Sequence, residues 1–186
     1  MKYGIFGGTF DPVHLGHLLL AESCREQVGL DHVFFVPTGV PPHKRAQSNR
    51  TPGHQRAEML EAALAGFAEF SVSRFEIDRS GVSFTAHTLQ HFHAMYPQAG
   101  LYLILGADMY NDLPNWYKPD LVRQLATPIV ACRPGSPPPK ADWTVPMPQT
   151  DISSSDIRRR IAESKSIRFH VPTPVEEYIR QHELYR

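Results

Sequence analysis

Residues 7–17 read GGTFDPVHLGH, and this stretch decides how the fold is interpreted. It follows an apolar run at 2–6 that predicts a strand, and it leads into a helical pattern of apolar residues at 15–28. Glycines let a backbone turn sharply and approach a ligand, and a helix start offers free N–H groups and partial positive charge. His14 and His17 stand three residues apart, so both side chains can face the same space. Together these features predict a phosphate-binding site between a strand and a helix.

The stretch lacks the two commonest phosphate-binding motifs. G-x-x-x-x-G-K-[ST] does not occur in it, which excludes a P-loop kinase or ATPase, and the absence of G-x-G-x-x-G excludes the fingerprint of Rossmann dehydrogenases. The simplest alternative is a turn that carries two surface histidines, since an H-x-x-H pair is frequent by chance. A full motif placed between a predicted strand and a predicted helix favours the phosphate site.

The composition is that of an ordinary globular protein without bulk charge. Of 186 residues, 41% are hydrophobic and 20% are charged, and 19 Lys and Arg balance 19 Asp and Glu. This balance gives no support for a nucleic-acid or membrane partner, so any anion site has to be local. We expect Cys24 and Cys132 to be small core residues without a disulfide or metal role. There is no recognisable signal peptide and no apolar run near the ~20 residues that span a bilayer, so we expect a cytoplasmic protein.

Short β-rich runs alternate with amphipathic helical segments along the chain. This alternation predicts an α/β fold, a doubly wound, Rossmann-like parallel sheet with helices on both faces. We expect a single domain over 1–186, with a small helical C-terminal part at 153–186. The predicted strands are 2–6, 32–36, 70–74, 101–105 and 128–132, and the predicted helices are 15–28, 53–65, 85–96, 119–125, 154–163 and 174–182.

Two loops are expected to converge on one crevice. In doubly wound sheets the ligand sits beyond the carboxyl ends of the strands. Gly7 and Gly8 follow the first predicted strand, and Gly-Ala-Asp at 106–108 follows the strand at 101–105. A polar, proline-containing loop at 37–52 is long enough to be functional, and whether it closes on a substrate is left open.

A second candidate site lies at 152–158, which reads ISSSDIR. Ser153 or Ser154 can cap a helix here, and Asp156 completes a capping-box pattern. A well-capped helix is the alternative explanation. The functional one is that a serine-rich helix start cradles phosphate, with the guanidinium of Arg158 one turn further in.

Both stretches resemble signatures of nucleotidylyltransferases. His14, Gly16 and His17 stand at the positions of the H-x-G-H signature. The stretch ISSSDIR is similar to the I-S-S-T-x-I-R motif that grips the ATP triphosphate, with Ser155 in place of the usual threonine. The hydroxyl is retained and only a methyl group is lost, so this departure is minor.

The resemblance becomes specific over nearly the full chain, where six motifs follow the order typical of bacterial nicotinate mononucleotide adenylyltransferases. They are GGTFDPVHLGHL at 7–18, VPTGVPPHK at 36–44, RSGVSFTAHT at 79–88, LGAD at 105–108 with LPNW at 113–116, ISSSDIR at 152–158 and VPTPVEEYI at 171–179. Phe84 replaces the tyrosine that is usual in the third motif, which removes a hydroxyl.

The resemblance implies transfer of the adenylyl group of ATP to nicotinate mononucleotide, giving deamido-NAD (nicotinate adenine dinucleotide) and pyrophosphate in NAD biosynthesis. The implied catalytic residues are His14, His17 and Arg158. The implied ATP site comprises Gly7, Gly8, Thr9, Phe10, His14, Gly16, His17, Gly106, Asp108, Ser154, Ser155 and Arg158. Mg²⁺ is expected as a cofactor held mainly by the ATP phosphates, without a metal site built by the protein.

The implied mononucleotide site comprises Lys44, Ser83, Phe84, Thr85, Trp116 and Arg133. Trp116 could stack on the pyridine ring, although a tryptophan that holds its loop onto the core is a competitive alternative. N–H groups at the helix start near 83–85 could receive the nicotinate carboxylate. Hydrogen bonds to a charged group contribute about 1.5–3 kcal/mol, so we expect the acid to be preferred over the amide by roughly two orders of magnitude.

Three alternatives are carried forward. An adenylyltransferase could act on nicotinamide mononucleotide, or on phosphopantetheine, although the phosphopantetheine enzyme would be shorter and would lack LPNW. A non-catalytic nucleotide sensor would be expected to lose a phosphate-binding residue, whereas His14, His17 and Arg158 are all present. The expected partners are ATP and nicotinate mononucleotide, with no nucleic acid and no membrane, and a homo-oligomer is left open.

Overall fold

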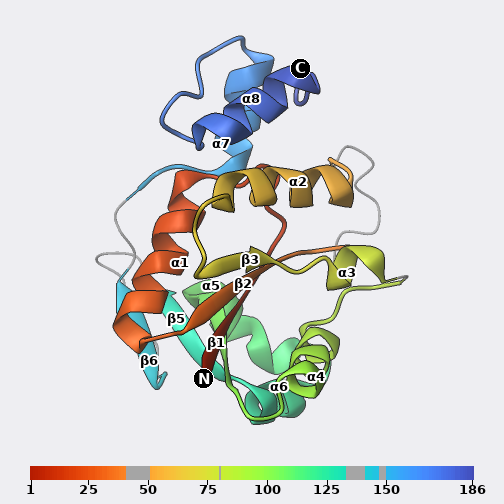
Figure 1. Cartoon of the computed structure of the whole chain (residues 1–186), viewed down its shortest axis with the longest axis vertical. Helices are drawn as coiled ribbons and strands as arrows, with labels where there is room; N and C mark the ends of the chain where they lie inside the picture. The colour runs from red at the N-terminus through yellow and green to blue at the C-terminus, as the bar shows by residue number, and fades with distance from the viewer. Residues whose placement is uncertain (41–50, 80, 133–140, 147–149) are drawn as a thin grey trace.

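The computed structural model describes residues 1–40, 51–79, 81–132, 141–146 and 150–186. Over these residues, six strands form one parallel sheet in the order β3-β2-β1-β4-β5-β6 (Figure 1). The strands are β1 (Lys2–Gly8), β2 (His32–Pro37), β3 (Phe70–Val72), β4 (Gly100–Gly106), β5 (Thr127–Cys132) and β6 (Trp143–Pro146). The predicted α/β fold and the five predicted strands are confirmed. Strand β6 was not predicted because it has only four residues and one buried side chain, Val145.

The six predicted helices are present, with bounds that differ from the prediction by at most one residue. The helical elements are α1 (Leu15–Val28), α2 (Gly53–Leu64), α3 (Phe75–Asp78), α4 (Thr85–Met95), α5 (Ala107–Asp112), the 3₁₀ helix η1 (Leu113–Asn115), α6 (Pro119–Leu125), α7 (Ser154–Ala162) and α8 (Thr173–Gln181). Elements α3, α5 and η1 were missed because three to six residues are too few to show a helical period.

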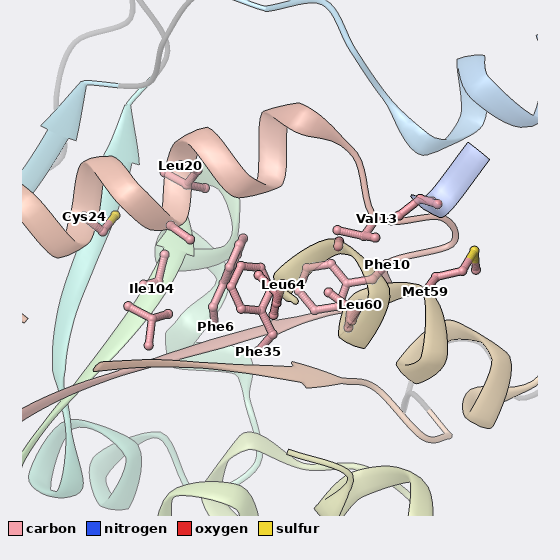
Figure 2. Packing of buried hydrophobic residues seen from close by; sticks show 14 of the residues in the cluster. Phe6, Phe10, Val13, Leu20, Cys24, Phe35, Met59, Leu60, Leu64 and Ile104 are labelled. Carbon is pink, nitrogen blue, oxygen red and sulfur yellow. The ribbon is translucent and has the colours of Figure 1, made fainter. Parts of the chain in front are cut away.

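Helices cover both faces of the sheet, and each face has its own apolar core (Figure 1). Adjacent residues of β1 point in opposite directions, so Phe6 is buried under α1 and α2 while Ile5 is buried on the face covered by α4 and α6. Figure 2 shows the first core, in which the rings of Phe6, Phe10 and Phe35 lie together between the sheet and the helices. Burial on both faces explains why the central strands read as continuous apolar runs.

The strand order places a topological switch point beside β1. This strand pairs with β2 on one side and with β4 on the other, and the chain fills the sheet outward from it in both directions. In doubly wound sheets the loops leaving such a pair of strands diverge, and the crevice between them binds the ligand. Gly8 ends β1 and Gly106 ends β4, so these two glycines mark the expected site.

The helical C-terminal part is anchored on the α1 and α2 side of the sheet. Ser153 caps α7 by accepting the N–H of Asp156 at 3.2 Å, as the capping pattern predicted. Helix α8 packs against α2, and the Tyr178 hydroxyl donates to the Glu58 carboxylate. The elements after residue 153 are therefore held next to the turn that follows β1.

The segment after β2, at 38–40, links the end of β1 to the residues just before the start of α4. The Thr38 N–H donates to the Gly8 carbonyl at 2.9 Å, and the Ser83 N–H donates to the Val40 carbonyl at 2.8 Å. Gly39 itself lies so close to α3 that a Cβ atom would stand 2.1 Å from the Glu76 carbonyl oxygen. No side chain fits at residue 39 unless the backbone shifts.

We predict that Gly39→Ala lowers the free energy of unfolding by about 1–3 kcal/mol, because the backbone must move to accept the methyl group. Gly100→Ala is the matched control, since its Cβ would make only ordinary contacts, with the Tyr102 ring at 3.5 Å and the Met1 carbonyl oxygen at 4.0 Å. The control should stay within about 0.5 kcal/mol of the parent. Urea denaturation measures both variants, and equal stabilities would contradict the close approach at residue 39.

Candidate active site

A cavity of about 740 Å³ opens at the carboxyl ends of β1 and β4. Its volume lies in the range typical of sites for small molecules. Eight of the predicted site residues line it together: Gly7, Gly8, Thr9, Ser83, Phe84, Thr85, Gly106 and Trp116. The turn after β1, the end of β4, the start of α4 and the segment after η1 thus meet around one space, as the sheet topology requires.

His14 and His17 form a stacked pair at the start of α1. Their ring centroids are 3.6 Å apart with an interplanar angle of 27°. The backbone N–H of His14 donates to Nδ1 of His17 at 3.2 Å, so the proton of the neutral His17 ring is on Nε2. Nδ1 of His14 is buried and has no hydrogen-bond partner in the described part of the chain. Buried polar atoms are rarely left in that state, which marks this ring as a candidate ligand contact.

Burial keeps both histidines neutral near pH 7. It lowers the pKa of His14 to about 4. Burial also lowers the pKa of His17 well below its usual value, and the adjacent His14 adds to this effect. The pair therefore offers ring N–H donors and unprotonated nitrogens, with little fixed positive charge of its own.

The turn between β1 and α1 is held from inside by Phe10. This residue has a left-handed backbone with φ of 49°, and its side chain is almost fully buried. Its ring meets the His17 ring edge-on at 5.0 Å and the Phe6 ring at 5.4 Å. A left-handed non-glycine residue persists only where its surroundings hold it, and here the apolar core does so (Figure 2).

Arg56 of α2 holds the same turn from beneath. Its guanidinium is buried and donates to three carbonyl oxygens, those of Thr9 at 2.6 Å, Thr38 at 2.7 Å and Thr51 at 3.0 Å. The two polar bonds of a trans peptide point in opposite directions. Binding the Thr9 carbonyl therefore turns the N–H of Phe10 away from Arg56, which leaves that donor free to face a ligand.

Helix α7 contacts the turn from the other side. Arg158 donates to the Asp11 carbonyl at 2.6 Å, and the Ser154 hydroxyl donates to the Pro12 carbonyl at 2.8 Å. Ser155 is exposed and shares a hydrogen bond with Ser153. The two stretches that resemble nucleotidylyltransferase signatures, 147 residues apart at Asp11 and Arg158, are thus in direct contact.

Glu76 is a buried acid that the sequence did not reveal as part of the site. It lines the cavity, and its carboxylate accepts the Thr88 hydroxyl at 2.6 Å and a hydrogen bond from Ser83, whose hydroxyl oxygen accepts the Gly39 N–H at 3.2 Å. Burial raises the pKa of Glu76 in spite of these hydrogen bonds. Glu76 thus ties the segment after β2 to the start of α4.

Trp116 both lines the cavity and packs against the core, so the two roles considered for it are compatible. Its indole N–H donates to the Asp112 carboxylate at 3.2 Å, and Asn115 donates to the same carboxylate at 2.9 Å. Phe84 and Tyr117 pack together with ring centroids 4.5 Å apart. One wall of the cavity is therefore aromatic and fixed by hydrogen bonds.

Proteins of similar sequence identify the family to which this chain belongs. A family model described as cytidylyltransferase-like matches residues 5–160. A Thermus thermophilus protein named "Probable nicotinate-nucleotide adenylyltransferase" is 44% identical over 189 residues, covering 100% of both chains. The chain belongs to the nicotinate-nucleotide adenylyltransferase family. A protein of the same name from Thermomicrobium roseum is 42% identical, covering 100% of this chain and 92% of that one.

A solved structure shares the fold of this adenylyltransferase family member. Plasmodium falciparum nicotinic acid mononucleotide adenylyltransferase complexed with NaAD superposes with a TM-score of 0.81 at 18% identity, covering 99% of this chain and 97% of that chain. At this identity the likeness concerns the fold alone. It extends over the whole sheet and the C-terminal helices.

Not every residue predicted for the adenylyltransferase site borders the cavity. Phe10, His14, Gly16, His17, Asp108, Ser154, Ser155 and Arg158 are not among its lining residues. Gly16 is buried beneath the His14 ring, and Asp108 is exposed on the first turn of α5. Lys44 and Arg133 lie outside the described residues. The turn and the start of α1, with Ser154 and Arg158 of α7, thus form a second group that adjoins the cavity through Gly7, Gly8 and Thr9.

Several lining residues of this adenylyltransferase were not among those predicted from the sequence. They are Thr38, Glu76, Thr88, Met109, Asp112, Asn115 and Tyr117. Most come from α3, α5, η1 and the residues next to them, which are too short for periodicity to detect. Thr38, Thr88 and Asn115 fall within three of the six motifs, so the polar positions of those motifs are the signal that could have indicated them.

Within the described residues, no group of three or more His, Cys, Asp or Glu side chains is arranged to hold a metal ion. Cys24 is buried, Cys132 is partly buried, and both are free. Among the helices that the structure describes, none combines the length and the apolar character needed to cross a membrane.

The burial of His14 predicts that the free energy of unfolding decreases as the pH is lowered from about 6.5 to about 4. The unfolded chain binds a proton near its usual pKa of 6.5, whereas the folded state does so only near about 4. The unfolded state therefore gains protons first as the pH falls, and this lowers the free energy of unfolding by up to about 1.4 kcal/mol per pH unit for this residue. Chemical denaturation across this range measures the slope.

His14→Gln is the matched comparison for this slope. Glutamine removes the titratable ring, so the free energy of unfolding of the variant should depend less steeply on pH in the same window. An unchanged slope would mean that His14 does not stay neutral in the folded protein.

Proposed function

We propose that this protein joins ATP to nicotinate mononucleotide, forming nicotinate adenine dinucleotide and releasing pyrophosphate. The observation that carries the proposal is the cavity at the switch point, where the glycine turn that leads to the histidine pair meets the start of α4 and Trp116. Family membership supports the reaction, since the relatives at 42–44% identity carry this enzyme's name.

The α4 side of the cavity suits the mononucleotide. A flat pyridine ring can stack on Trp116, whose indole is held by Asp112. The N–H groups at the start of α4, at Phe84 and Thr85, favour the nicotinate carboxylate. Glu76 lies nearby, and the Thr88 hydroxyl that donates to its carboxylate at 2.6 Å offsets part of the repulsion between the two carboxylates.

The β1 turn suits the triphosphate. The N–H of Phe10, the histidine rings and the start of α7 surround one region, because Ser154 and Arg158 contact the turn directly. Gly106 and Asp108 extend this region toward the ribose and adenine, and Lys44 and Arg133 supply further positive charge. We propose that Mg²⁺ arrives with ATP and is held mainly through its phosphates, since it keeps several waters and relies on substrate oxygens.

The chemistry is an in-line displacement at the α-phosphorus. A 5′-phosphate oxygen of the mononucleotide forms a new P–O bond, the bond to the bridging oxygen breaks, and pyrophosphate leaves. The nucleophile is already an anion, so no catalytic base is needed. His17, with its proton on Nε2, can donate to the reacting phosphate, and Arg158 adds positive charge. Orientation of the two substrates can contribute about 7–11 kcal/mol.

We predict rapid pyrophosphate release from Mg²⁺-ATP with nicotinate mononucleotide, and roughly 10²-fold lower kcat/KM with nicotinamide mononucleotide, because only the acid pairs with the α4 start. Phosphopantetheine should give no release. Parallel assays with the three acceptors make the comparison. Equal release with the first two would retain the reaction and refute the carboxylate pocket, whereas no release with any acceptor would favour a nucleotide sensor.

We predict that His17→Ala lowers kcat by about 10²-fold or more, the size expected when a donor to the transition state is removed. His93→Ala on the exposed side of α4 is the control and should retain normal turnover. Steady-state pyrophosphate release measures both variants, with melting temperatures to establish that they are folded. Near-normal turnover of His17→Ala would refute the role assigned to this ring.

A cytoplasmic location, a single domain, the absence of nucleic-acid or membrane partners and the oligomeric state stay predictions from the sequence.

A further inference from the structure

A tyrosine near the C-terminus reaches back to the turn that follows β1. The Tyr185 hydroxyl donates to Oδ1 of Asp11 at 2.7 Å, across 174 residues of sequence. Asp11 is buried, with 4% of its surface exposed. A buried carboxylate needs hydrogen-bond donors, so this contact bears directly on how the turn is held.

The chain after α8 follows an unusual path that delivers Tyr185 to this position. Glu183 and Tyr185 have left-handed backbones, with φ of 52° and 66°. Between them, the N–H of Leu184 donates to the Ile179 carbonyl at 3.1 Å, and both Leu184 and Tyr185 pack against the core. Two left-handed non-glycine residues in one short segment cost free energy, so tertiary contacts must select this conformation.

The Tyr185 hydroxyl is a dependable donor at this site. Burial raises the pKa of Tyr185, and the Asp11 carboxylate raises it further, so the hydroxyl keeps its proton at any pH where the enzyme is studied. Thr51, whose carbonyl is held by Arg56, also forms a hydrogen bond with Tyr185. The contact therefore belongs to the same network that holds the Thr9 carbonyl.

Asp11 is the one side chain of this turn that brings negative charge toward a region proposed to bind phosphates. The carbonyls of Thr9, Asp11 and Pro12 are held by Arg56, Arg158 and Ser154. Those contacts fix the backbone, but they leave the direction of the Asp11 carboxylate undetermined. Tyr185 determines it, because a short hydrogen bond to Oδ1 keeps the carboxylate on the side of the C-terminal segment.

We propose that Tyr185 is a positioning residue for adenylyl transfer. Its hydroxyl holds the Asp11 carboxylate in place, and this keeps the turn at 9–12 in the conformation whose N–H groups meet the ATP phosphates. The inference rests on the proposed function. Tyr185 acts through Asp11 and does not itself touch the reacting atoms.

Tyr185→Phe tests the proposal, because it removes the hydroxyl and keeps the ring. We expect kcat to fall about tenfold, equivalent to about 1.4 kcal/mol, while KM for ATP changes by less than about threefold. Tyr178→Phe is the matched control, since it also removes a hydroxyl bonded to a carboxylate, that of Glu58, away from the turn. The control should keep the parent kcat even if its melting temperature falls. Equal kcat in both variants and the parent would overturn the proposal.

Asp11→Ala provides a second test, because alanine has no oxygen that could accept the Tyr185 hydroxyl. If Tyr185 acts through the Asp11 carboxylate, kcat of Asp11→Ala is lower than that of the parent, and adding Tyr185→Phe changes it by less than about twofold. Independent effects that multiply in the double variant would overturn the proposal, because Tyr185 would then act by another route.

Hydrogen exchange separates this inference from the proposed function. Amide exchange of a peptide covering 7–14, measured without substrates, should be faster in Tyr185→Phe than in the parent and unchanged in Tyr178→Phe. If the parent protein released no pyrophosphate with any acceptor, the proposed function would fail. Faster exchange in Tyr185→Phe would still show that the contact between Tyr185 and Asp11 holds the turn. Unchanged exchange in Tyr185→Phe, together with unchanged kcat, would show that Tyr185 does not position the turn.

Discussion

The site depends on how the backbone carbonyls of the turn at 9–12 are bound. Buried carbonyl groups must find donors, and here the donors are side chains from α2 and α7. Arg56 matters most, because its one buried guanidinium joins the turn, the segment after β2 and Thr51, which lies just before α2. Because Arg56 holds the Thr9 carbonyl, the N–H of Phe10 in the same peptide points away from Arg56.

The electrostatics of the site follow from burial. The histidine pair is neutral because the low-dielectric surroundings disfavour its charged form, and the same cause raises the pKa of Glu76. The histidine pair thus contributes oriented N–H groups without fixed charge, while Arg56 and Arg158 bring the positive charge that holds the turn. Such preorganised dipoles need no rearrangement as charge develops in a displacement at phosphorus.

Much of the architecture could be predicted because it is repeated along the sequence. Apolar runs alternate with helical patterns, so five strands, six helices and the parallel sheet followed from periodicity. The short helices α3, α5 and η1 could not be predicted from periodicity, because each contains less than two full turns. Strand β6 could not be predicted either, because only one of its side chains is buried. Those short elements supply Glu76, Asp112 and Asn115, and so the α4 side of the cavity was only partly foreseen.

By itself the sequence determined the fold class, the family and the two motifs that come together, since glycine turns, capping serines and paired histidines have local physical signatures. Only the tertiary structure decided which side chains support those motifs. Arg56 binds the Thr9 carbonyl 47 residues away, Glu76 accepts from Thr88 12 residues away, and Tyr185 donates to Asp11 174 residues away. Contacts of this kind leave no pattern along one sequence, because folding alone brings their partners together.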